Sequence, residues 1–421
     1  MQRSLFRYTT AFLLPLLAVG LVLTGCDSTG SNGGGGDETA TFEYPSNNYG
    51  AETVTNLLAF ELGVRVGNAT DNSESALLDR YEGNADDITI RAAQDLTTEG
   101  QNVYSDIQGG VDLSSQVSTA DLLRGNELES PDSPNAGSLV NTDELLRYYF
   151  QEAGANNVGP ATSNGIVLSQ FAEKMLLGTP LYGQGAAILS DFANGNVSSN
   201  RAEQWDAAFG YFGFPRTLEP FVDYEGGGEG LADGPARDID GDGVDLTSEY
   251  VHTWAAYAIE RSATAEANSE SPSNNFAQRA FEALVQGRKE IANENYENLS
   301  SRAQTALDAW EATVAVNVIH YINSMEGNLE DASGTLEGPQ GDSSGDVGED
   351  AWGEAKAFAW SLQFYSRDAL RSQDLNNVLE DIGNDPPYGE MTASEYASDL
   401  QDATDILADT YDFDSDNVQS W

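Results

Sequence analysis

The stretch RDIDGDGVDLTSEYVHTW, residues 237–254, has residue types and spacing that suit a metal ion. Asp238, Asp240 and Asp242 occupy the first, third and fifth positions of the calcium-loop pattern D-x-[DN]-x-[DN]-G-x5-E, and Gly243 occupies the sixth. Calcium is a hard cation that binds about six to eight oxygen atoms, so it requires carboxylates and carbonyls in this arrangement. The alternative is an ordinary acidic turn in a chain that is rich in aspartate.

The second half of the loop supplies the remaining predicted ligands. Val244 would bind through its carbonyl at the seventh position, and Glu249 would supply a bidentate carboxylate at the twelfth. Asp245 stands at the eighth position, where an apolar residue is usual, and is an alternative ligand to Glu249. The glycine-rich residues before Asp238 favour a lone EF-hand-type loop over a paired EF-hand. We therefore predict a structural Ca²⁺ that joins the loop to a helix beginning near Thr247.

Three other polar residues form a weaker candidate for a second metal or catalytic site. His320 lies in VNVIHYINS, Asp206 in AEQWDAAFGYFGFP and Glu354 in AWGEAKAFAWSLQF, and all three segments are otherwise rich in apolar residues. Such residues are more often satisfied core groups or part of a solvated face than ligands. If the three converged, they could hold a metal ion that activates water for hydrolysis. The common metalloprotease, nucleophile-elbow and phosphate-loop patterns do not occur in the chain.

The elements that would position these residues are helices. Apolar residues recur at three- and four-residue steps in SSRAQTALDAWEATVAVNVIHYINSM, residues 300–325, and the same spacing marks most of the chain. The segment ADDITIRAA is the one short candidate for a strand. We therefore predict a mainly α fold, a helical bundle. The helices are predicted at 51–67, 142–154, 164–178, 200–213, 247–267, 275–291, 300–325, 349–365 and 392–411.

The beginning of the chain predicts export and a lipid anchor. A positive segment, a short apolar run and the junction Leu23-Thr24-Gly25 precede Cys26, which is typical of a bacterial lipoprotein signal peptide at 1–25. Cys26 is the only cysteine, so it is the expected acylation site and the chain cannot form an internal disulfide. Residues 26–41 read as a flexible tether, and 42–421 as a helical domain whose seam near 223–243 allows two subdomains.

Composition limits the partners. The formal net charge is −50, with 69 acidic and 19 basic residues, so the surface repels nucleic acid and anionic lipid. A hydrophobic content of 40% argues for a packed fold and against a disordered acidic chain. Adaptation to high salt is the simplest explanation of the acidic excess, because concentrated salt screens the repulsion between carboxylates.

The order of several segments resembles a known family. The segments EQWDAAFGYFG, DIDGDG with DLTSEY, VIHYIN, AWGEAKAFAWSLQF and LADTYDFDSDNVQSW are spread over the region 42–421. Together they resemble the bacterial lipoprotein family catalogued as domain of unknown function 4856, akin to the imelysin-like proteins associated with iron uptake. The resemblance implies a secreted, imelysin-like helical bundle. Ala207 stands where the family favours an acid, and the chain lacks the G-x-H-x-x-E pattern, so no imelysin metal or peptidase residue is carried over.

These observations favour one function and leave two alternatives. The favoured function is a calcium-stabilised binding protein, tethered through Cys26 to a bacterial membrane, with the outer membrane favoured and the side left open. Its ligand would be a metal or another nutrient. The alternatives are a metal-assisted hydrolase and a structural or adhesive surface module, and the sequence favours a protein that is not an enzyme.

Overall fold

Amphipathic and fully buried helices build the fold. The computed structural model describes residues 40–44, 47–67, 73–94, 96–118, 141–156, 165–221, 236–268, 275–339, 344–364, 370 and 372–421. Internal contacts group Thr39–Trp421 as one unit. The predicted signal peptide, Cys26, nearly all of the tether and most of the predicted seam lie outside the described residues. None of the helices in the described ranges is both long and apolar enough to cross a membrane.

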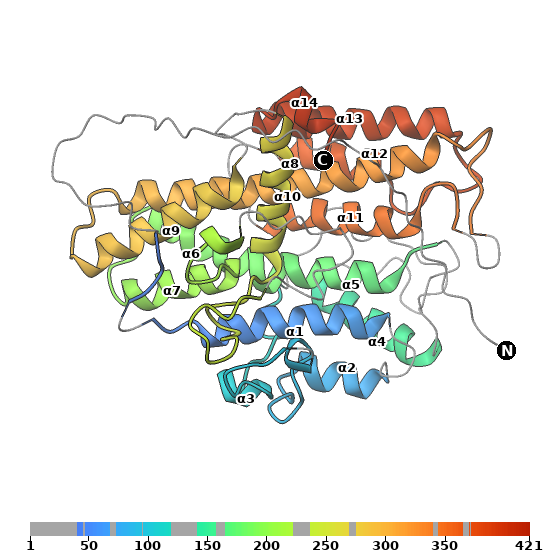
Figure 1. The fold of residues 1–421 in the computed structure, drawn as a ribbon. Coiled ribbons are helices and arrows are strands. Elements are labelled where there is room, and N and C mark those ends of the chain that lie inside the picture. The colour runs from blue at the N-terminus through green and yellow to red at the C-terminus, as the bar shows by residue number, and fades with distance from the viewer. Residues whose placement is uncertain are drawn as a thin grey trace. The chain divides into compact units, whose positions relative to one another are not determined.

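The mainly α class is confirmed, and the first half of the chain contains mostly short helices (Figure 1). Helices α1, α5 and α7 lie within four residues of their predicted limits; apolar spacing on one face explains α5, whereas α1 is buried on most of its sides. The elements of this half are α1 (Gly50–Val66), α2 (Glu74–Tyr81), η1 (Ala92–Gln94), α3 (Tyr104–Ile107), α4 (Thr142–Asn156), α5 (Leu168–Leu177), the π-helix η3 (Gly178–Gly183), α6 (Gln184–Ala193), α7 (Arg201–Phe212) and η4 (Glu219–Phe221).

The second half contains the longer helices. These are α8 (Thr253–Asn268), α9 (Phe276–Ala292), α10 (Leu299–Leu329), α11 (Glu349–Phe364), α12 (Ser372–Ile382), α13 (Ala393–Tyr411) and α14 (Ser415–Val418). The prediction that a helix begins near Thr247 is wrong, because residues before Thr253 form a turn that the Asp245 side chain closes. The segment ADDITIRAA forms no strand, and its Thr89 makes an isolated bridge with Val103.

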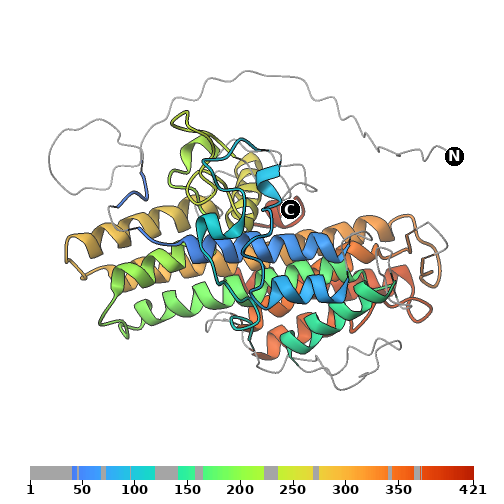
Figure 2. The ribbon, with the colours of Figure 1, turned by 90° about the horizontal axis from the view of Figure 1, so that it is seen from below.

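Helix α10 is the centre of the bundle. It packs against α6, α8, α9, α11 and α13, and most of its side chains are buried. A helix that is apolar on nearly all sides is stable only when neighbours cover every side. Figure 1 shows that the axes of α1, α5, α10, α11 and α13 are nearly aligned, whereas the axis of α8 crosses them. The view in Figure 2, turned by 90°, shows the same set of aligned helices.

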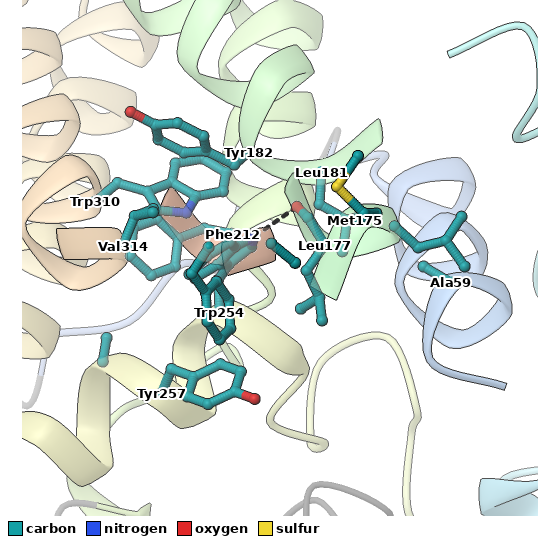
Figure 3. Close-up of a cluster of buried hydrophobic side chains, with 14 of the residues drawn as sticks. Ala59, Met175, Leu177, Leu181, Tyr182, Phe212, Trp254, Tyr257, Trp310 and Val314 are labelled. Carbon is teal, nitrogen blue, oxygen red and sulfur yellow. Dashed lines mark hydrogen bonds between the residues drawn. The ribbon is translucent and has the colours of Figure 1, made fainter. Parts of the chain in front are cut away.

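Aromatic side chains fill the junction between α8, α10 and the π-helix (Figure 3). Trp254 and Trp310 are fully buried, and Phe212 lies with its ring centroid 4.4 Å from that of Trp310. The indole N–H of Trp254 donates a hydrogen bond of 2.9 Å to the carbonyl of Leu177, at the end of α5. A buried indole requires such an acceptor, so this bond fixes α8 against the start of the π-helix.

Between α7 and α8, the described residues 213–221 and 236–252 contain only the short helix η4 as regular structure, and they carry the predicted calcium loop. Short pairings hold it in place: Thr217 bridges to Thr41, Val244 to Thr98, and Ala236 to Tyr250. The Ala236–Tyr250 bridge joins the two ends of the loop to each other, and the Val244–Thr98 bridge ties its middle to backbone that is distant in sequence. The loop is therefore positioned by the surrounding fold, although it has little regular structure of its own.

Candidate functional site

The three aspartates of the predicted calcium loop converge. Asp238, Asp240 and Asp242 each offer a carboxylate oxygen, and these oxygens lie within 4.8 Å of one another on the exposed surface. The backbone N–H of Gly241 donates to Asp238 Oδ1 at 2.6 Å, which curls the chain around the three side chains. In the described part of the chain, this is the only group of three or more His, Cys, Asp or Glu side chains with such geometry.

Gly243 occupies the position where the loop must turn sharply. Its φ is +114°, a conformation that side chains with a Cβ rarely adopt. A Cβ at this position would also come within 3.0–3.1 Å of the backbone of Thr98 and Glu99. Glycine is therefore required both for the turn and for the close approach of the neighbouring segment.

The second half of the loop is arranged differently from the prediction. The Val244 carbonyl, a predicted ligand, accepts a hydrogen bond of 3.1 Å from the backbone N–H of Glu99, and Val244 N donates to Thr97 O at 2.9 Å. A carbonyl oxygen has two lone pairs, so this bond leaves one available for a cation. Val244 therefore serves first to join the loop to residues 97–99.

Asp245, the alternative ligand, caps the turn that follows the loop. Its Oδ1 accepts hydrogen bonds from Thr247 N at 2.9 Å and from Gln101 Nε2 at 2.8 Å, and its Oδ2 accepts one from Ser248 Oγ at 2.7 Å. Both oxygens are thus engaged, and Asp245 is not in the converging group. Its position is that of a structural cap rather than a ligand.

Glu249 is buried and already has a cationic partner. Only 1% of its side chain is exposed, and its carboxylate accepts hydrogen bonds from Ile239 N at 3.3 Å and Asp245 N at 3.2 Å. It also forms an ion pair with the guanidinium of Arg216. Burial raises the pKa of Glu249, while the two backbone donors and Arg216 act in the opposite direction.

Arg216 connects the loop to its surroundings and was missed by the sequence analysis. Its Nη2 lies 3.0 Å from Asp240 Oδ2, and its Nε lies 3.6 Å from Glu43 Oε1. The two carboxylates that calcium would need at the third and twelfth positions, those of Asp240 and Glu249, therefore share one guanidinium. The available signal was that Arg216 follows Pro215 in a chain with few basic residues.

The charges of the loop repel one another. The pKa of Asp242 is raised mainly because its carboxyl is hydrogen-bonded to Asp240, and the negative charges of Asp240 and Asp238 add to this effect. The same hydrogen bond, together with Arg216, lowers the pKa of Asp240. Asp242 also raises the pKa of Glu99 across the bridge. A divalent cation bound by the loop would relieve this repulsion among the carboxylates of Asp238, Asp240, Asp242 and Glu99.

A cavity of about 690 Å³, wide open to the surface, lies directly beside the loop. One wall is formed by segments 42–44 and 47–50, another by Gln101 with Asp106 and Ile107, and a third by Arg216 and the turn at Asp245. This volume is in the range of pockets that hold small organic ligands. Arg216 lines the cavity and also pairs with Asp240 and Glu249 of the loop. A change in the loop can therefore reach the cavity through this one side chain.

The weaker second site is not formed. Asp206 on α7 makes a buried ion pair with Arg288 on α9, with 2.6 Å between Oδ1 and Nε. Glu354 on α11 is 3.0 Å from the ammonium group of Lys174 on α5. His320 on α10 is half-buried, and a backbone hydrogen bond links it to Trp421. The structure does not bring these three candidates into one metal-binding group.

Lys174 forms a buried polar cluster that the sequence analysis also missed. Its side chain is 4% exposed, and its ammonium group lies 2.5 Å from Glu173 Oε1 and 3.0 Å from Glu354 Oε1. The Tyr257 ring lies 5.8 Å from the same nitrogen. Lys356 is likewise buried, 1% exposed, and donates to the Leu379 carbonyl at 2.7 Å. Lys174 thus links α5 to α11, and Lys356 links α11 to α12, through buried polar contacts.

Neither of the two histidines is expected to titrate near its usual pKa in the folded protein. Burial lowers the pKa of His252 to about 4, and burial with the nearby Arg261 charge lowers that of His320 to about 3. His252 Nε2 is 2.7 Å from the Leu246 carbonyl, so this nitrogen carries the proton of the neutral ring.

An unfolded histidine titrates at about 6.5, so the unfolded chain binds more protons than the native one as the pH falls from about 6.5 to about 4 for His252 and to about 3 for His320. Both histidines therefore reduce stability progressively as the pH falls through this window. Proton NMR should show both imidazoles neutral between about pH 8 and 5 in the folded chain. The urea-unfolded chain is the control and should titrate near 6.5, whereas a folded imidazole titrating there would contradict the burial.

Comparison with known proteins gives no match. Neither a protein-family model, nor a curated protein, nor a solved structure is similar enough to the chain to assign it to a family. The candidate site therefore rests on the geometry of the loop, the cavity and Arg216.

Proposed function

We propose that the protein is a membrane-tethered, extracytoplasmic binding protein in which the loop at 238–249 binds Ca²⁺ as a structural ion. The observation that carries the proposal is the convergence of three aspartate carboxylates beside a cavity of about 690 Å³. A spacer or adhesive module requires no such cavity, and the residues of the hydrolase alternative do not converge. The lipid anchor at Cys26 and the kinship with the lipoprotein family named above are parts of the same proposal.

The residues present are suited to calcium and to few other metals. Asp238, Asp240 and Asp242 offer only oxygen, and the loop contains no histidine or cysteine, so softer transition metals lack their preferred ligands. Glu249 would complete the set once its carboxylate is released from Arg216. The ion would then act as an EF-hand-type cross-link between the loop and the segments that the bridges at Val244 and Ala236 hold.

Nutrient acquisition is the role that best fits a tethered binding protein. The cavity offers tyrosine, asparagine, glutamine and arginine side chains, which can bind polar organic molecules through hydrogen bonds and ring contacts. Growth of a deletion strain under limitation of iron, other metals or organic nutrients tests this part. Unchanged growth in every condition would remove nutrient acquisition and leave the calcium loop as a separate question.

Asp240→Ala is expected to abolish a calcium-dependent increase in the melting temperature. A ligand that binds only the native state stabilises it in proportion to the logarithm of its concentration, and this variant removes one of three converging ligands. The measurement is thermal unfolding of the full chain in detergent and high salt, with calcium or with chelator. Asp414→Ala, in the other Asp-rich segment, is the matched control and should keep the shift. A wild-type chain with no shift and no bound calcium would make the loop an acidic turn.

A further inference from the structure

Tyr49 lines the cavity beside the calcium loop, which we call the open cavity, and its hydroxyl has no partner in the protein. The residue is only 5% exposed, and its ring contacts Phe42 and Phe209 edge to face. The hydroxyl makes no hydrogen bond to any described residue. Unlike the unpaired hydroxyl of Thr179, it is not sealed off from solvent. A ligand in the open cavity would supply the acceptor that this phenol lacks.

The charges that act on Tyr49 show where its hydroxyl lies. Burial raises the pKa of Tyr49, and the negative charges of Asp245 and Asp206 raise it further. The charges of Arg216 and Glu43 act on it as well, in opposite directions. Asp245, Arg216 and Glu43 all line the open cavity, so the hydroxyl faces it. At neutral pH the hydroxyl keeps its proton and can donate it.

Arg216 offers further unused donors to the open cavity. Its two hydrogen bonds to carboxylates of the loop both come from Nη2, and no described residue accepts one from Nη1. Its Nε is 3.6 Å from Glu43 Oε1, which is too long for a hydrogen bond. The backbone holds Arg216 in place, since its N–H donates to Ser248 O and its carbonyl accepts from Phe42 N, both at 2.7 Å. Free guanidinium N–H groups favour a carboxylate as acceptor.

The first turn of α1 adds backbone donors at the same wall. Tyr49 is the N-cap of this helix, and its side chain does not cap it. No described residue accepts a hydrogen bond from the N–H of Gly50 or Ala51, and Gly50 lines the open cavity. The start of a helix carries a partial positive charge that favours an anion. Hydroxyl, guanidinium and backbone donors at one cavity therefore all favour the same kind of group.

The acids of the open cavity determine the second charge of the ligand. Both oxygens of Asp245 are engaged, and Oδ2 of Asp106 accepts hydrogen bonds from Asn102 N at 2.8 Å and Val103 N at 3.0 Å. Glu43 is 60% exposed and accepts no hydrogen bond from a described residue. The lining has three acidic residues and one basic residue, so it repels a simple anion. A ligand that carries an ammonium group beside its carboxylate avoids this repulsion.

We propose that the open cavity binds a free α-amino acid, with its carboxylate on the Tyr49 hydroxyl and Arg216 and its ammonium group on Glu43. In an α-amino acid both charged groups are attached to the same carbon atom. Glu43 Oε1 is 3.6 Å from Arg216 Nε, so one small molecule can contact both. This inference rests on the proposed role of the cavity in nutrient binding, and it names the class of nutrient.

Isothermal titration of the full chain in detergent tests the proposal, with each of the common L-amino acids as probe. The amino acid that binds most tightly is then compared with its primary amide, which lacks the carboxylate charge, and with its deamino analogue, which lacks the ammonium group. Each analogue should bind about tenfold more weakly or worse, because each loses one charge-assisted contact.

Two variants assign these contacts to side chains. Tyr49→Phe should weaken amino-acid binding about tenfold and leave stability unchanged, because the lost hydroxyl has no partner in the protein. Its effect on the primary amide should be smaller. Glu43→Gln should weaken amino-acid binding about threefold and leave the deamino analogue unaffected. The matched controls are Tyr396→Phe, which loses a bond of 2.8 Å to Ile382 O, and Glu390→Gln at an exposed position, and both should keep the affinity.

The outcomes separate this inference from the proposed function. Binding of no amino acid, or equal losses in Tyr49→Phe and Tyr396→Phe, would overturn the inference. A sugar or an organic acid that binds the wild-type chain but not Tyr49→Phe would keep the cavity as a binding site and overturn the amino-acid class. Calcium-dependent stabilisation is measured on the same samples. A calcium shift without amino-acid binding leaves the loop intact, and amino-acid binding without a calcium shift supports the cavity alone.

Discussion

Replacing Asp206 with alanine is expected to lower the free energy of unfolding by about 3–5 kcal/mol, because it leaves the guanidinium of Arg288 buried without its anion. The two side chains are 1% and 3% exposed, and their charged atoms are 2.6 Å apart. Arg288 also lies over the Tyr44 ring, which cannot compensate for the lost charge. Denaturant unfolding of the full chain at fixed high salt measures the change.

A double replacement identifies the cause. Asp206→Leu with Arg288→Met removes both charges and keeps most of the volume, so it should recover most of the lost stability. The control is Glu82→Ala, which breaks an exposed pair with Arg147 and should cost less than about 1 kcal/mol. If the double variant were as unstable as Asp206→Ala alone, the pair would not be the source of the effect.

Replacing Arg216 with glutamine is expected to raise the calcium affinity of the loop about tenfold, equivalent to about 1.4 kcal/mol. The guanidinium pairs with Asp240 and Glu249, so calcium must displace it to bind both carboxylates. Without calcium, the same replacement should destabilise the chain, since Glu249 loses its cation and stays buried. Isothermal titration measures the affinity, and thermal unfolding with chelator measures the stability.

Arg201→Gln is the matched control for this experiment. Arg201 begins α7 while Arg216 follows its other end, so the control changes the net charge equally without touching the loop. It lies over the exposed Tyr296 ring and has no contact with the aspartates. An equal rise in affinity in both variants would show only a general effect of net charge. An unchanged affinity in Arg216→Gln would mean that Arg216 and calcium do not share these carboxylates.

The helices could be predicted because their signal is local. Apolar spacing alone locates α9, α10 and α13 to within a few residues, since each buried face repeats with the helical period. The start of α8 could not be found in this way. Asp245 uses its side chain to close a turn, and the six residues before Thr253 therefore remain outside the helix although their composition suits one.

The candidate site was predictable only in part, because local spacing is readable from one sequence and contacts between distant segments are not. The aspartates of the loop lie two residues apart, so their convergence follows from local spacing. The partner of Glu249 is 33 residues away, and the partner of Asp206 is 82 residues away. Packing of distant helices decides such pairs, and one sequence contains no local signal for them. The sequence could therefore offer Asp206, Glu354 and His320 only as a weak candidate site, and in the structure each of the three has a different neighbour.

The burial of Lys174 and Lys356 affects how the protein can be modified chemically. The chain has three lysines, and Lys289 is the only one of them that is exposed. An amine-specific reagent applied to the native protein therefore finds one lysine side chain within residues 40–421, on the outer side of α9. Among lysine side chains, acylating labels and resin coupling through amines would therefore act at Lys289, and the chain's α-amino group is the other amine they could reach.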